Sequence, residues 1–400
     1  MNVLFLTLLD FESIEERNIY TDLLREFVKH GHCVYAISPV EKKRKKKTHI
    51  VSERNTIVLK LRIGNIQKTS VIEKGISTIM LEPIFIHAIK QYFSDVKFDL
   101  ILYSTPPISL VGAIEYAKKR DNAKTYLLLK DIFPQNAVDL GMLKTTGIKG
   151  LLYKHFRYQE KRLYNISDRI GCMSEANVKY VIKHNPEIDS NKVEVCPNSI
   201  EVKNTSVNYV TRKRIRAKYK IPNDKTVFIY GGNIGKPQGV PFIIECLEKC
   251  KDIKDAFFLV VGNGTEFGKL EAYKKHYKQN NFRLMNGLPK EDYDILVSSC
   301  DVGLIFLDHR FIIPNFPSRL LSYMQAKITV LACTDPNTDI GRIIIKEGFG
   351  WWCESNDSAK FCDLVKRIIG VSNKADMAEN AMKCLENNYS VEKSYDIIMR

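Results

Sequence analysis

The chain has 400 residues, which is more than one ordinary hydrophobic core accommodates and therefore predicts two domains. Hydrophobic residues make up 44% and charged residues 27% of the chain, which is the balance of a soluble globular protein. The formal net charge of +15 indicates an anionic partner, namely a nucleic acid, a phosphorylated substrate or an acidic membrane surface.

The ten cysteines do not form the paired pattern of a zinc site, and we expect buried free thiols in a reducing compartment. No stretch reaches the roughly 18 to 20 apolar residues of a membrane-spanning helix. The apolar start, Met1 to Leu9, runs directly into acidic residues, so we interpret it as a buried strand and not as a signal peptide. These features predict a cytoplasmic protein.

Short apolar strands alternate with amphipathic helices in the first half of the chain. We expect strands at NVLFLTLL, CVYAISP, DLILYS and TYLLLKD, with helices at IEERNIYTDLLREFVKHG and LVGAIEYAKKR between them. Ile170–Met173 and Val193–Val195 add two further short strands. This alternation predicts a parallel sheet that helices cover on both faces.

A polar, irregular stretch from Asn198 to about Thr211 separates this half from a second one. The alternation then restarts with TVFIYGG, VPFIIECLEKC, AFFLVVGNG, FRLMNG and DYDILVSSC. We expect domains at 1–203 and 204–375, followed by C-terminal helices at 376–400 that pack back on the first domain. The predicted fold is α/β, with two Rossmann-like doubly wound parallel-sheet domains facing a cleft.

The stretch FIYGGNIGKPQG, residues 228–239, carries an apolar strand into a glycine-rich turn, and a helix pattern begins at Val240. Glycines permit close backbone approach, and a helix N-terminus presents free N–H groups, so a diphosphate suits this position. Lys236 adds a positive charge. The turn matches neither a Walker loop nor GxGxxG, and an ordinary glycine-rich connection remains the alternative.

Two further glycine turns, Gly262–Gly264 and Asn286–Gly287, follow the next two strands of the same domain. A fourth strand, VGLIFL, leads to a helix that begins near Pro317. Ser318 is expected to cap this helix, and Arg319 to bind a phosphate or a sugar carboxylate. The alternative is a plain cap beside a solvated arginine.

Several of these segments carry a resemblance to a known family. FIYGGNIGKPQG, FFLVVGNG, NGLPKEDYDILVSSCDVGLIFL and FPSRLLSYMQAKITVLACTD resemble family 4 glycosyltransferases of the GT-B type, and KVEVCPNSIEV resembles their interdomain segment. STPPISLVGAIEYAKKR and LLLKDIFPQNAVDLG resemble the acceptor domain of the bacterial surface-polysaccharide branch, which transfers N-acetylfucosamine- or N-acetylglucosamine-type sugars. The resemblance extends over nearly the whole chain.

The resemblance implies an acceptor domain followed by a nucleotide-sugar domain. It further implies a UDP-sugar donor, a lipid-linked or saccharide acceptor in O-antigen or capsule synthesis, and retention of anomeric configuration. No cofactor and no essential metal are expected, because no DxD motif is evident. The donor-site residues it implies are Gly231, Gly232, Asn233, Gly235, Lys236, Gln238, Gly262, Asn263, Gly264, Asn286, Gly287, Pro317, Ser318, Arg319 and Ser322.

The chain departs from the family pattern at several of these positions. The two glutamates that the family commonly carries around the last helix fall near Pro314 and Ser322, and neither is acidic. A common arginine and lysine fall at Asn233 and Gln238. Ser322 and Gln325 could instead hydrogen-bond a ribose hydroxyl.

Asp131 stands at the end of a strand in KDIFPQ and is the predicted catalytic residue, which orients the acceptor hydroxyl. A helix cap or a salt bridge to Lys130 is the alternative role. His309 and Arg310 precede the loop before the last helix of the donor site and are weaker candidates for contacting the donor sugar.

Two basic segments indicate a peripheral position on an anionic membrane surface. The first is a loop with the six cations Lys42, Lys43, Arg44, Lys45, Lys46 and Lys47. The second is a helix at 147–163, where Lys154 and Arg157 adjoin an apolar face with Leu151, Leu152, His155 and Phe156. A solvated lysine loop is the alternative. Nucleic acid is not expected as a partner, because no binding module is recognised.

The leading hypothesis is a membrane-associated glycosyltransferase that uses a nucleotide sugar. A UDP-sugar 2-epimerase has the same architecture, but it needs clustered acids and histidines, of which this chain offers few. A non-catalytic relative is a third possibility because of the missing glutamates, and a nucleic-acid binder is a fourth.

Overall fold

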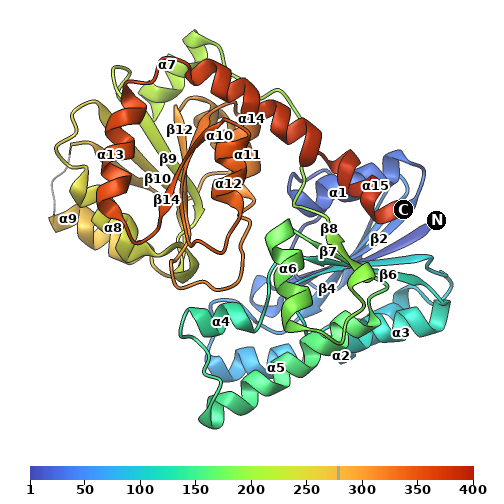
Figure 1. Cartoon of the computed structure of the whole chain (residues 1–400). Helices are drawn as coiled ribbons and strands as arrows, with labels where there is room; N and C mark the ends of the chain where they lie inside the picture. The colour runs from blue at the N-terminus through green and yellow to red at the C-terminus, as the bar shows by residue number, and fades with distance from the viewer. Residues whose placement is uncertain (277–279) are drawn as a thin grey trace. The chain divides into compact units, whose positions relative to one another are not determined.

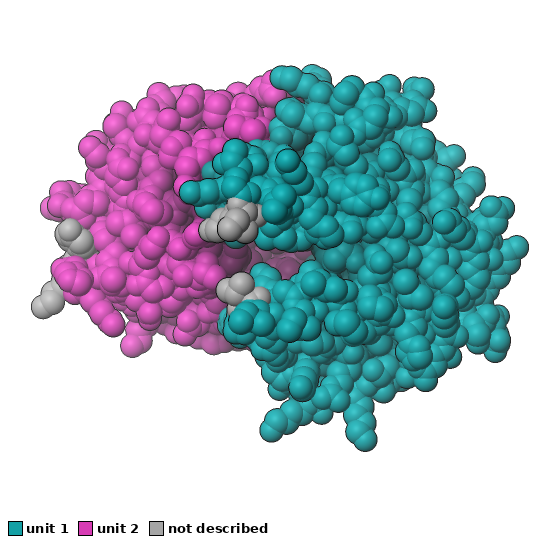
Figure 2. All heavy atoms as spheres, turned by 90° about the horizontal axis from the view of Figure 1, so that it is seen from below, with its two compact units in different colours: residues 1–200, 391–400 teal, residues 201–390 magenta. Residues whose placement is uncertain are grey.

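The computed structural model describes residues 1–276 and 280–400. The chain divides into two compact units, of which unit 1 comprises residues 1–200 and 391–400, and unit 2 comprises residues 201–390 (Figure 1, Figure 2). The chain passes into unit 2 after Ile200, within the polar stretch of the sequence. Each unit contains one sheet.

Unit 1 contains an eight-stranded sheet in the order β3-β4-β2-β1-β5-β6-β7-β8. All its strand pairs are parallel except β3 with β4. Its strands are β1 (Asn2–Leu6), β2 (Cys33–Glu41), β3 (His49–Glu53), β4 (Thr56–Ile63), β5 (Leu100–Ser104), β6 (Lys124–Leu129), β7 (Arg169–Cys172) and β8 (Val193–Val195). Its helices are α1 (Ile19–Lys29), α2 (Val71–Tyr92), α3 (Val111–Asp121), α4 (Gln135–Asp139), α5 (Gly147–Ile166), α6 (Glu175–His184) and α15 (Val391–Met399), with short 3-10 turns η1 (Lys42–Arg44) and η2 (Ser190–Lys192).

Unit 2 contains a six-stranded, all-parallel sheet in the order β11-β10-β9-β12-β13-β14. Its strands are β9 (Thr226–Asn233), β10 (Ala256–Asn263), β11 (Phe282–Met285), β12 (Val302–Phe306), β13 (Thr329–Thr334) and β14 (Gly350–Glu354). Its helices are α7 (Tyr209–Lys218), α8 (Val240–Lys249), α9 (Phe267–His276), α10 (Lys290–Ser298), α11 (Arg319–Gln325), α12 (Ile340–Lys346), α13 (Ser358–Ile369) and α14 (Lys374–Asn388), with the 3-10 turn η3 (Lys236–Gln238).

The inner strands of unit 2, β9, β10, β12 and β13, are buried on both faces over most of their length, which is why they read as continuous apolar runs. One core lies between the sheet and helices α8, α9 and α13, where side chains such as Phe228, Val260 and Phe361 pack together. Helices α10, α11, α12 and α14 lie on the other side of the sheet in Figure 1. The prediction of two parallel-sheet α/β domains is confirmed.

The C-terminal helices are divided between the two units. Helix α14 belongs to unit 2, and α15 belongs to unit 1, where it packs beside α1 (Figure 1). The Tyr395 ring meets Phe27 edge to face at 5.0 Å between centroids, and its hydroxyl lies 2.8 Å from His32 Nε2. Of the C-terminal helices expected at 376–400 to pack back on the first domain, α15 does so, whereas α14 belongs to unit 2.

Two further findings concern the predictions from composition. All ten cysteines are free thiols, and nine of them are buried. Among the helices of residues 1–276 and 280–400, none has the length and apolar character that crossing a bilayer requires.

The parallel register of β9 with β10 sets Gly232 beside Gly262, and it allows a sharp mutational test. A Cβ at Gly262 would collide with the Gly232 carbonyl oxygen. We expect Gly262→Ala to lower the free energy of unfolding by about 1–3 kcal/mol because the backbone must shift. Urea unfolding followed by circular dichroism measures this change.

Gly268→Ala on α9 is the matched control, because a Cβ there meets no atom within 4 Å. This second substitution should be neutral or slightly stabilising, since alanine favours a helix more than glycine does. Equal losses of stability in the two variants would contradict the close approach of β9 and β10.

Candidate functional site

The carboxyl ends of four adjacent strands form the candidate donor site of unit 2. Strands β11, β10, β9 and β12 are neighbours and parallel, so their ends lie along one edge of the sheet. Gly231 and Gly232 lie at the end of β9, and Gly262 lies at the end of β10, so the strands extend into the glycine turns that the sequence predicted. Gly287 follows β11, and the connection after β12 leads to α11. The structure therefore brings the sequence-predicted donor residues together at one edge, where parallel α/β sheets bind ligands.

Two different structural constraints require glycine at this edge of the sheet. A Cβ at Gly231 would collide with the Tyr293 hydroxyl, and one at Gly264 would collide with the Ile234 carbonyl oxygen, so these glycines serve close packing. Gly232 is exposed and has a φ of +116°, which side chains rarely adopt. Its open side faces the Arg319 guanidinium, whose Cζ would lie 3.7 Å from a Cβ placed there.

Arg319 is the first residue of α11, and its side chain lies next to Gly232 at the end of β9. Its Cζ lies 4.2 Å from the centroid of the Tyr230 ring, a cation–π arrangement. Its Nη1 is buried without a hydrogen-bond partner, and within the described chain Arg319 forms no ion pair. The Tyr293 hydroxyl is likewise buried without a partner. A guanidinium with an unused buried donor has capacity to bind an anion.

Polar side chains surround this position along the edge. Lys236 is exposed on η3 and has no salt bridge among the described residues, and the side chains of Asn233, Asn263 and Asn286 are exposed beside the turns. Gln238 has a different role, because its buried Oε1 accepts from the Gly235 N–H at 3.0 Å and from Asn233 Nδ2 at 3.2 Å. It holds the shape of the glycine-rich turn. A Cβ added at Gly287 would lie only 2.8 Å from Asn263 Nδ2, so a larger residue there would displace the Asn263 side chain.

Helix α11 differs from the prediction in its capping. Ser318 occupies the N-cap position, just after Pro317, but its side chain makes no capping hydrogen bond because its backbone is already helical. Ser322 is half-buried one turn later. Gln325 is buried, and its side-chain oxygen accepts a hydrogen bond from the Lys203 N–H at 3.0 Å. Gln325 thereby holds the linker of unit 2. Its contact with a ribose stays a prediction.

The weaker candidate Arg310 is already paired. Its Nε and Nη2 donate to the two carboxylate oxygens of Asp308 at 2.8 and 2.7 Å. This bidentate pair neutralises the charge of Arg310, so Arg319 and Lys236 remain the cations of this edge that lack a carboxylate partner in residues 1–276 and 280–400.

Asp131 follows β6 in unit 1 and is held by neighbouring polar groups. Asn136 Nδ2 donates to its Oδ2 at 2.6 Å, and the Thr105 hydroxyl donates to its carbonyl oxygen at 2.9 Å, whereas Oδ1 is buried without a partner. Burial raises the pKa of Asp131 to about 6, opposed by hydrogen bonds from Ile132 N–H and Asn136. A carboxyl group with this pKa changes charge near neutral pH and can accept a proton from a hydroxyl.

The structural alternatives for Asp131 do not account for its carboxylate. Lys130 Nζ donates to the Pro197 carbonyl oxygen at 3.2 Å, so no salt bridge joins the two residues. Helix α4 has Pro134 at its N-cap position and no capping side chain. Tyr20 lies close enough for the Asp131 charge to raise the pKa of its phenol, although burial is the main cause of that rise.

The two basic segments differ in how far their charges are engaged. All six cations of residues 42–47 are exposed, and three of them form ion pairs, namely Lys43 with Glu41, Arg44 with Asp10 and Lys46 with Glu12. Lys154 on α5 is exposed. Arg157 is instead bound to Glu160 Oε2 at 2.5 Å and to the His184 carbonyl oxygen at 2.9 Å.

The predicted apolar face of α5 is also smaller than expected. Phe156 packs against Phe133 with ring centroids 5.0 Å apart, so it belongs to the interior contacts of unit 1. Leu151, Leu152 and Tyr158 remain exposed on the helix. Arg157 and Phe156 are half-buried and are partly engaged within unit 1, so they offer less to a membrane surface than the sequence predicted.

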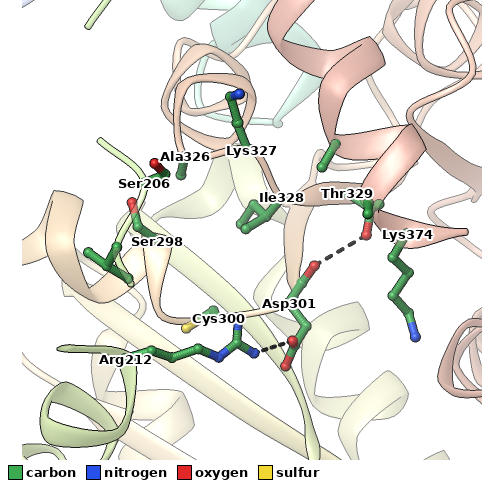
Figure 3. Close-up of a pocket in the computed structure, with 13 residues that line it drawn as sticks. Ser206, Arg212, Ser298, Cys300, Asp301, Ala326, Lys327, Ile328, Thr329 and Lys374 are labelled. Atoms are coloured by element: carbon green, nitrogen blue, oxygen red, sulfur yellow. Dashed lines mark hydrogen bonds and ion pairs between the residues drawn. The ribbon is translucent and has the colours of Figure 1, made fainter. Parts of the chain in front are cut away.

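A pocket of about 260 Å³ lies at the opposite, amino edge of the unit 2 sheet (Figure 3). Asp301 immediately precedes β12 there, and Figure 3 shows Arg212 and Thr329 pointing toward it. Arg212 pairs with the Asp301 carboxylate, and the Thr329 hydroxyl donates to the Asp301 carbonyl oxygen at 3.2 Å. Because these groups satisfy one another, the pocket has less binding capacity than the carboxyl edge.

Sequence reasoning missed the tyrosines around Arg319. Tyr230 and Tyr323 are buried beside the guanidinium, and Tyr293 is half-buried with a buried hydroxyl. The Tyr323 hydroxyl donates to the Leu304 carbonyl oxygen at 3.0 Å. The three tyrosines are distant from one another in the chain and follow no common spacing, so no local pattern connects them.

Comparisons with known proteins show similarity to glycosyltransferases. Residues 211–384 match the model of the family described as Glycosyl transferases group 1. Probable glycosyltransferase WbjE of Pseudomonas aeruginosa is 26% identical over 309 residues, which cover 75% of this chain and 73% of WbjE. Putative colanic acid biosynthesis glycosyl transferase WcaI of Escherichia coli (strain K12) is 23% identical over 252 residues, covering 62% of this chain and 60% of WcaI.

Solved structures show the same fold over the whole chain. Anabaena HepE in complex with UDP-glucose superimposes with a TM-score of 0.72 at 14% identity, covering 100% of this chain and 98% of HepE. At this level of identity the similarity concerns the fold alone. Residues 211–384 are therefore similar to the Glycosyl transferases group 1 family, and the whole chain has the two-domain GT-B fold.

Proposed function

We propose that this protein transfers a sugar from a nucleoside diphosphate sugar, with UDP as the nucleotide, to a lipid-linked or saccharide acceptor in the synthesis of a cell-surface polysaccharide. The observation that carries the proposal is Arg319, whose unpartnered buried donor lies beneath the glycine turn of a group 1 domain. The names of WbjE and WcaI and the UDP-glucose bound by HepE support the sugar and nucleotide classes.

The diphosphate of the donor is assigned to the carboxyl edge of unit 2. Breaking the bond between the sugar C1 and the diphosphate leaves negative charge on the phosphate oxygens. Arg319 and Lys236 offer cations, and the exposed backbone at Gly232 permits close approach. Helix α8 begins just after this turn without a capping side chain, so its N-terminal N–H groups also favour an anion. These groups supply the stabilisation that a metal gives in other transferases, so we expect no metal requirement.

The acceptor is assigned to unit 1, where Asp131 offers the unpartnered Oδ1. In the reaction an acceptor oxygen bonds to C1 as the diphosphate leaves, and the hydroxyl proton passes to Asp131 or to the leaving phosphate. The family 4 resemblance implies retention of configuration, with the acceptor entering on the face that the diphosphate leaves. In such a front-side transfer, Asp131 mainly orients the acceptor hydroxyl.

A non-catalytic nucleotide-sugar-binding protein is the second candidate. Ser322 stands where the family commonly has a glutamate at the ribose, and a half-buried serine hydroxyl offers a weaker hydrogen bond to ribose than a carboxylate does. Donor binding without transfer or hydrolysis would favour this candidate. The epimerase alternative is disfavoured by the group 1 match, and it would be detected as interconversion of UDP-sugars without an acceptor.

A nucleotide panel tests the donor assignment. We expect UDP and UDP-sugars to raise the thermal unfolding midpoint, and EDTA to leave the rise unchanged because Arg319 and Lys236 hold the diphosphate. GDP, ADP and CMP are the matched comparisons. Stabilisation by none of these nucleotides would contradict the donor site, and loss of stabilisation in EDTA would contradict metal-independent binding.

Arg319→Ala tests whether Arg319 binds the diphosphate, on which the proposal rests. Removing a charged hydrogen-bond donor should weaken UDP affinity by about ten- to a hundredfold in calorimetry, corresponding to about 1.5–3 kcal/mol. Arg367→Ala, at an exposed position near the end of α13, is the matched control and should keep the affinity unchanged. Unchanged UDP affinity in Arg319→Ala would remove Arg319 from the site.

Asp131→Asn tests both the pKa and the role of this carboxyl group. Because the pKa is raised to about 6 in the folded protein, ionisation of Asp131 costs stability, and this cost grows as pH rises from about 4 through 6. The variant should therefore unfold at a higher temperature than the unmodified protein at pH 7.5, while the difference shrinks toward pH 4. We expect its transfer rate to fall by about a hundredfold or more.

The pH dependence of kcat/KM gives the matched kinetic measurement. For the unmodified chain it should rise through a pKa near 6, and this rise should be absent in Asp131→Asn. An unaltered rate and pH profile in the variant would exclude Asp131 from the reaction, whatever its effect on unfolding.

A further inference from the structure

Helix α2 exposes a row of large apolar side chains along one side. Ile72, Ile76 and Ile79 have exposed fractions of 77%, 61% and 76%, and they lie on successive turns. The opposite side of α2 is buried in unit 1 through residues such as Leu81 and Phe85. A helix that is apolar on both sides requires a second apolar environment for its outer side.

The isoleucine row continues into an apolar groove of about 320 Å³ between α2 and the hairpin of β3 and β4. Met80, Pro83, Ile84 and Leu61 contribute apolar side chains to this groove. Met80 and Pro83 lie next to Ile76 and Ile79 on the helix surface, so the row and the groove form one continuous apolar strip.

The basic turn at residues 42–47 is fixed beside the start of α2. The Lys43 N–H donates to Asn65 Oδ1 at 2.9 Å, and Lys43 Nζ donates to the Gln67 carbonyl oxygen at 2.6 Å. Asn65 Nδ2 in turn donates to Glu73 Oε1 at 2.7 Å in the first turn of α2. Hydrogen bonds from Thr69 and Asn65 lower the pKa of Glu73, and the charges of Lys42 and Lys43 add to this effect. The apolar strip and the cationic turn are therefore neighbours.

The charges around the strip that lack an ion-pair partner among the described residues are positive. Lys42, Lys45, Lys47, Lys68 and Lys74 are exposed, and within the part of the chain that the structure describes they form no salt bridge. The two acids of α2 are engaged, Glu73 as above and Glu82 through the Gly112 N–H, which donates to its Oε2 at 2.8 Å. The surface thus combines an apolar strip with free cations.

We propose that this surface of unit 1 docks on an anionic lipid bilayer, with Ile72, Ile76 and Ile79 inserted at the level of the headgroups and the surrounding lysines on the lipid phosphates. An apolar strip with a cationic border matches the chemistry of a bilayer interface. Because the inner side of α2 packs into unit 1, the helix lies along the bilayer surface.

Other occupants fit the same surface less well. A second copy in a symmetric dimer would bring the same lysines against each other, which is unfavourable. A nucleic acid would use the cations but gain little from a row of isoleucines. The proposal extends the proposed function, since it names the element of unit 1 through which the chain reaches a lipid-linked acceptor. Vesicle binding needs no nucleotide sugar, so it is measured independently of the donor site.

Vesicle flotation tests the proposal with the full chain, using phosphatidylcholine alone and phosphatidylcholine mixed with phosphatidylglycerol. We expect binding to the mixed vesicles only. Ile76→Ser combined with Ile79→Ser should lower the partition coefficient by about tenfold or more because apolar burial is lost. Lys42→Gln combined with Lys45→Gln and Lys47→Gln should lower it by about a hundredfold and remove most of its salt dependence.

Matched controls lie on unit 2. Ile345→Ser on α12 removes an isoleucine with an exposed fraction of 56%, and the triple change Lys254→Gln, Lys274→Gln, Lys275→Gln removes the same charge from exposed positions. Both controls should bind vesicles like the unmodified chain. Equal losses in the α2 variant and its control, or in the basic-turn variant and its control, would overturn the proposal.

Ile76→Trp gives a direct measure of insertion. Its fluorescence should shift to shorter wavelength with mixed vesicles and be quenched by brominated lipids, whereas Ile345→Trp should show neither change. An α2 tryptophan that remains in water on bound vesicles would overturn the insertion. Self-association that depends on Ile76 and Ile79, or capture of an acidic protein in place of vesicles, would overturn the choice of a bilayer. The thermal unfolding midpoint of each variant without ligand serves as the folding control.

Discussion

The parallel register between β9 and its neighbours is the constraint on which the candidate donor site depends. It sets Gly232 beside Gly262 and Asn233 beside Asn263, so that turns separated in the chain lie along one edge. The strands approach so closely that a Cβ at Gly262 or Gly264 has no room. The glycines that suggest a phosphate site thus first serve strand packing, and Gly232 is the one whose open side faces a cation.

Arg319 gives this edge a positive charge that no carboxylate of the described residues neutralises. It is placed by the connection from β12 into α11 and held over the Tyr230 ring, while its Nη1 lacks a partner. Other arginines of unit 2 have carboxylate partners, as Arg310 has in Asp308 at the same edge and Arg212 has in Asp301 at the opposite edge. A charge kept without a carboxylate costs stability in the free protein, and a bound diphosphate would compensate it.

Unit 1 shows two comparable departures from what stability alone favours. Asp131 keeps a buried, unpartnered Oδ1 and a raised pKa, and α2 keeps exposed isoleucines beside unneutralised lysines. Both features become favourable only when something binds, an acceptor hydroxyl in the first case and a lipid surface in the second. Such sites are where local rules of folding and the requirements of binding conflict.

The sequence by itself determined the α/β class, the polar division near residue 200 and the carboxyl-edge glycine turns, because strand runs and glycine turns are local patterns. It did not show α2 as a surface element, since a helix that is apolar all round has no distinct periodicity. Only the tertiary structure decided that Gln325 holds the linker, that Arg157 is paired and that three distant tyrosines surround Arg319. Those roles depend on contacts between side chains that are far apart in the sequence. Such contacts produce no regular spacing of residues from which they could be predicted.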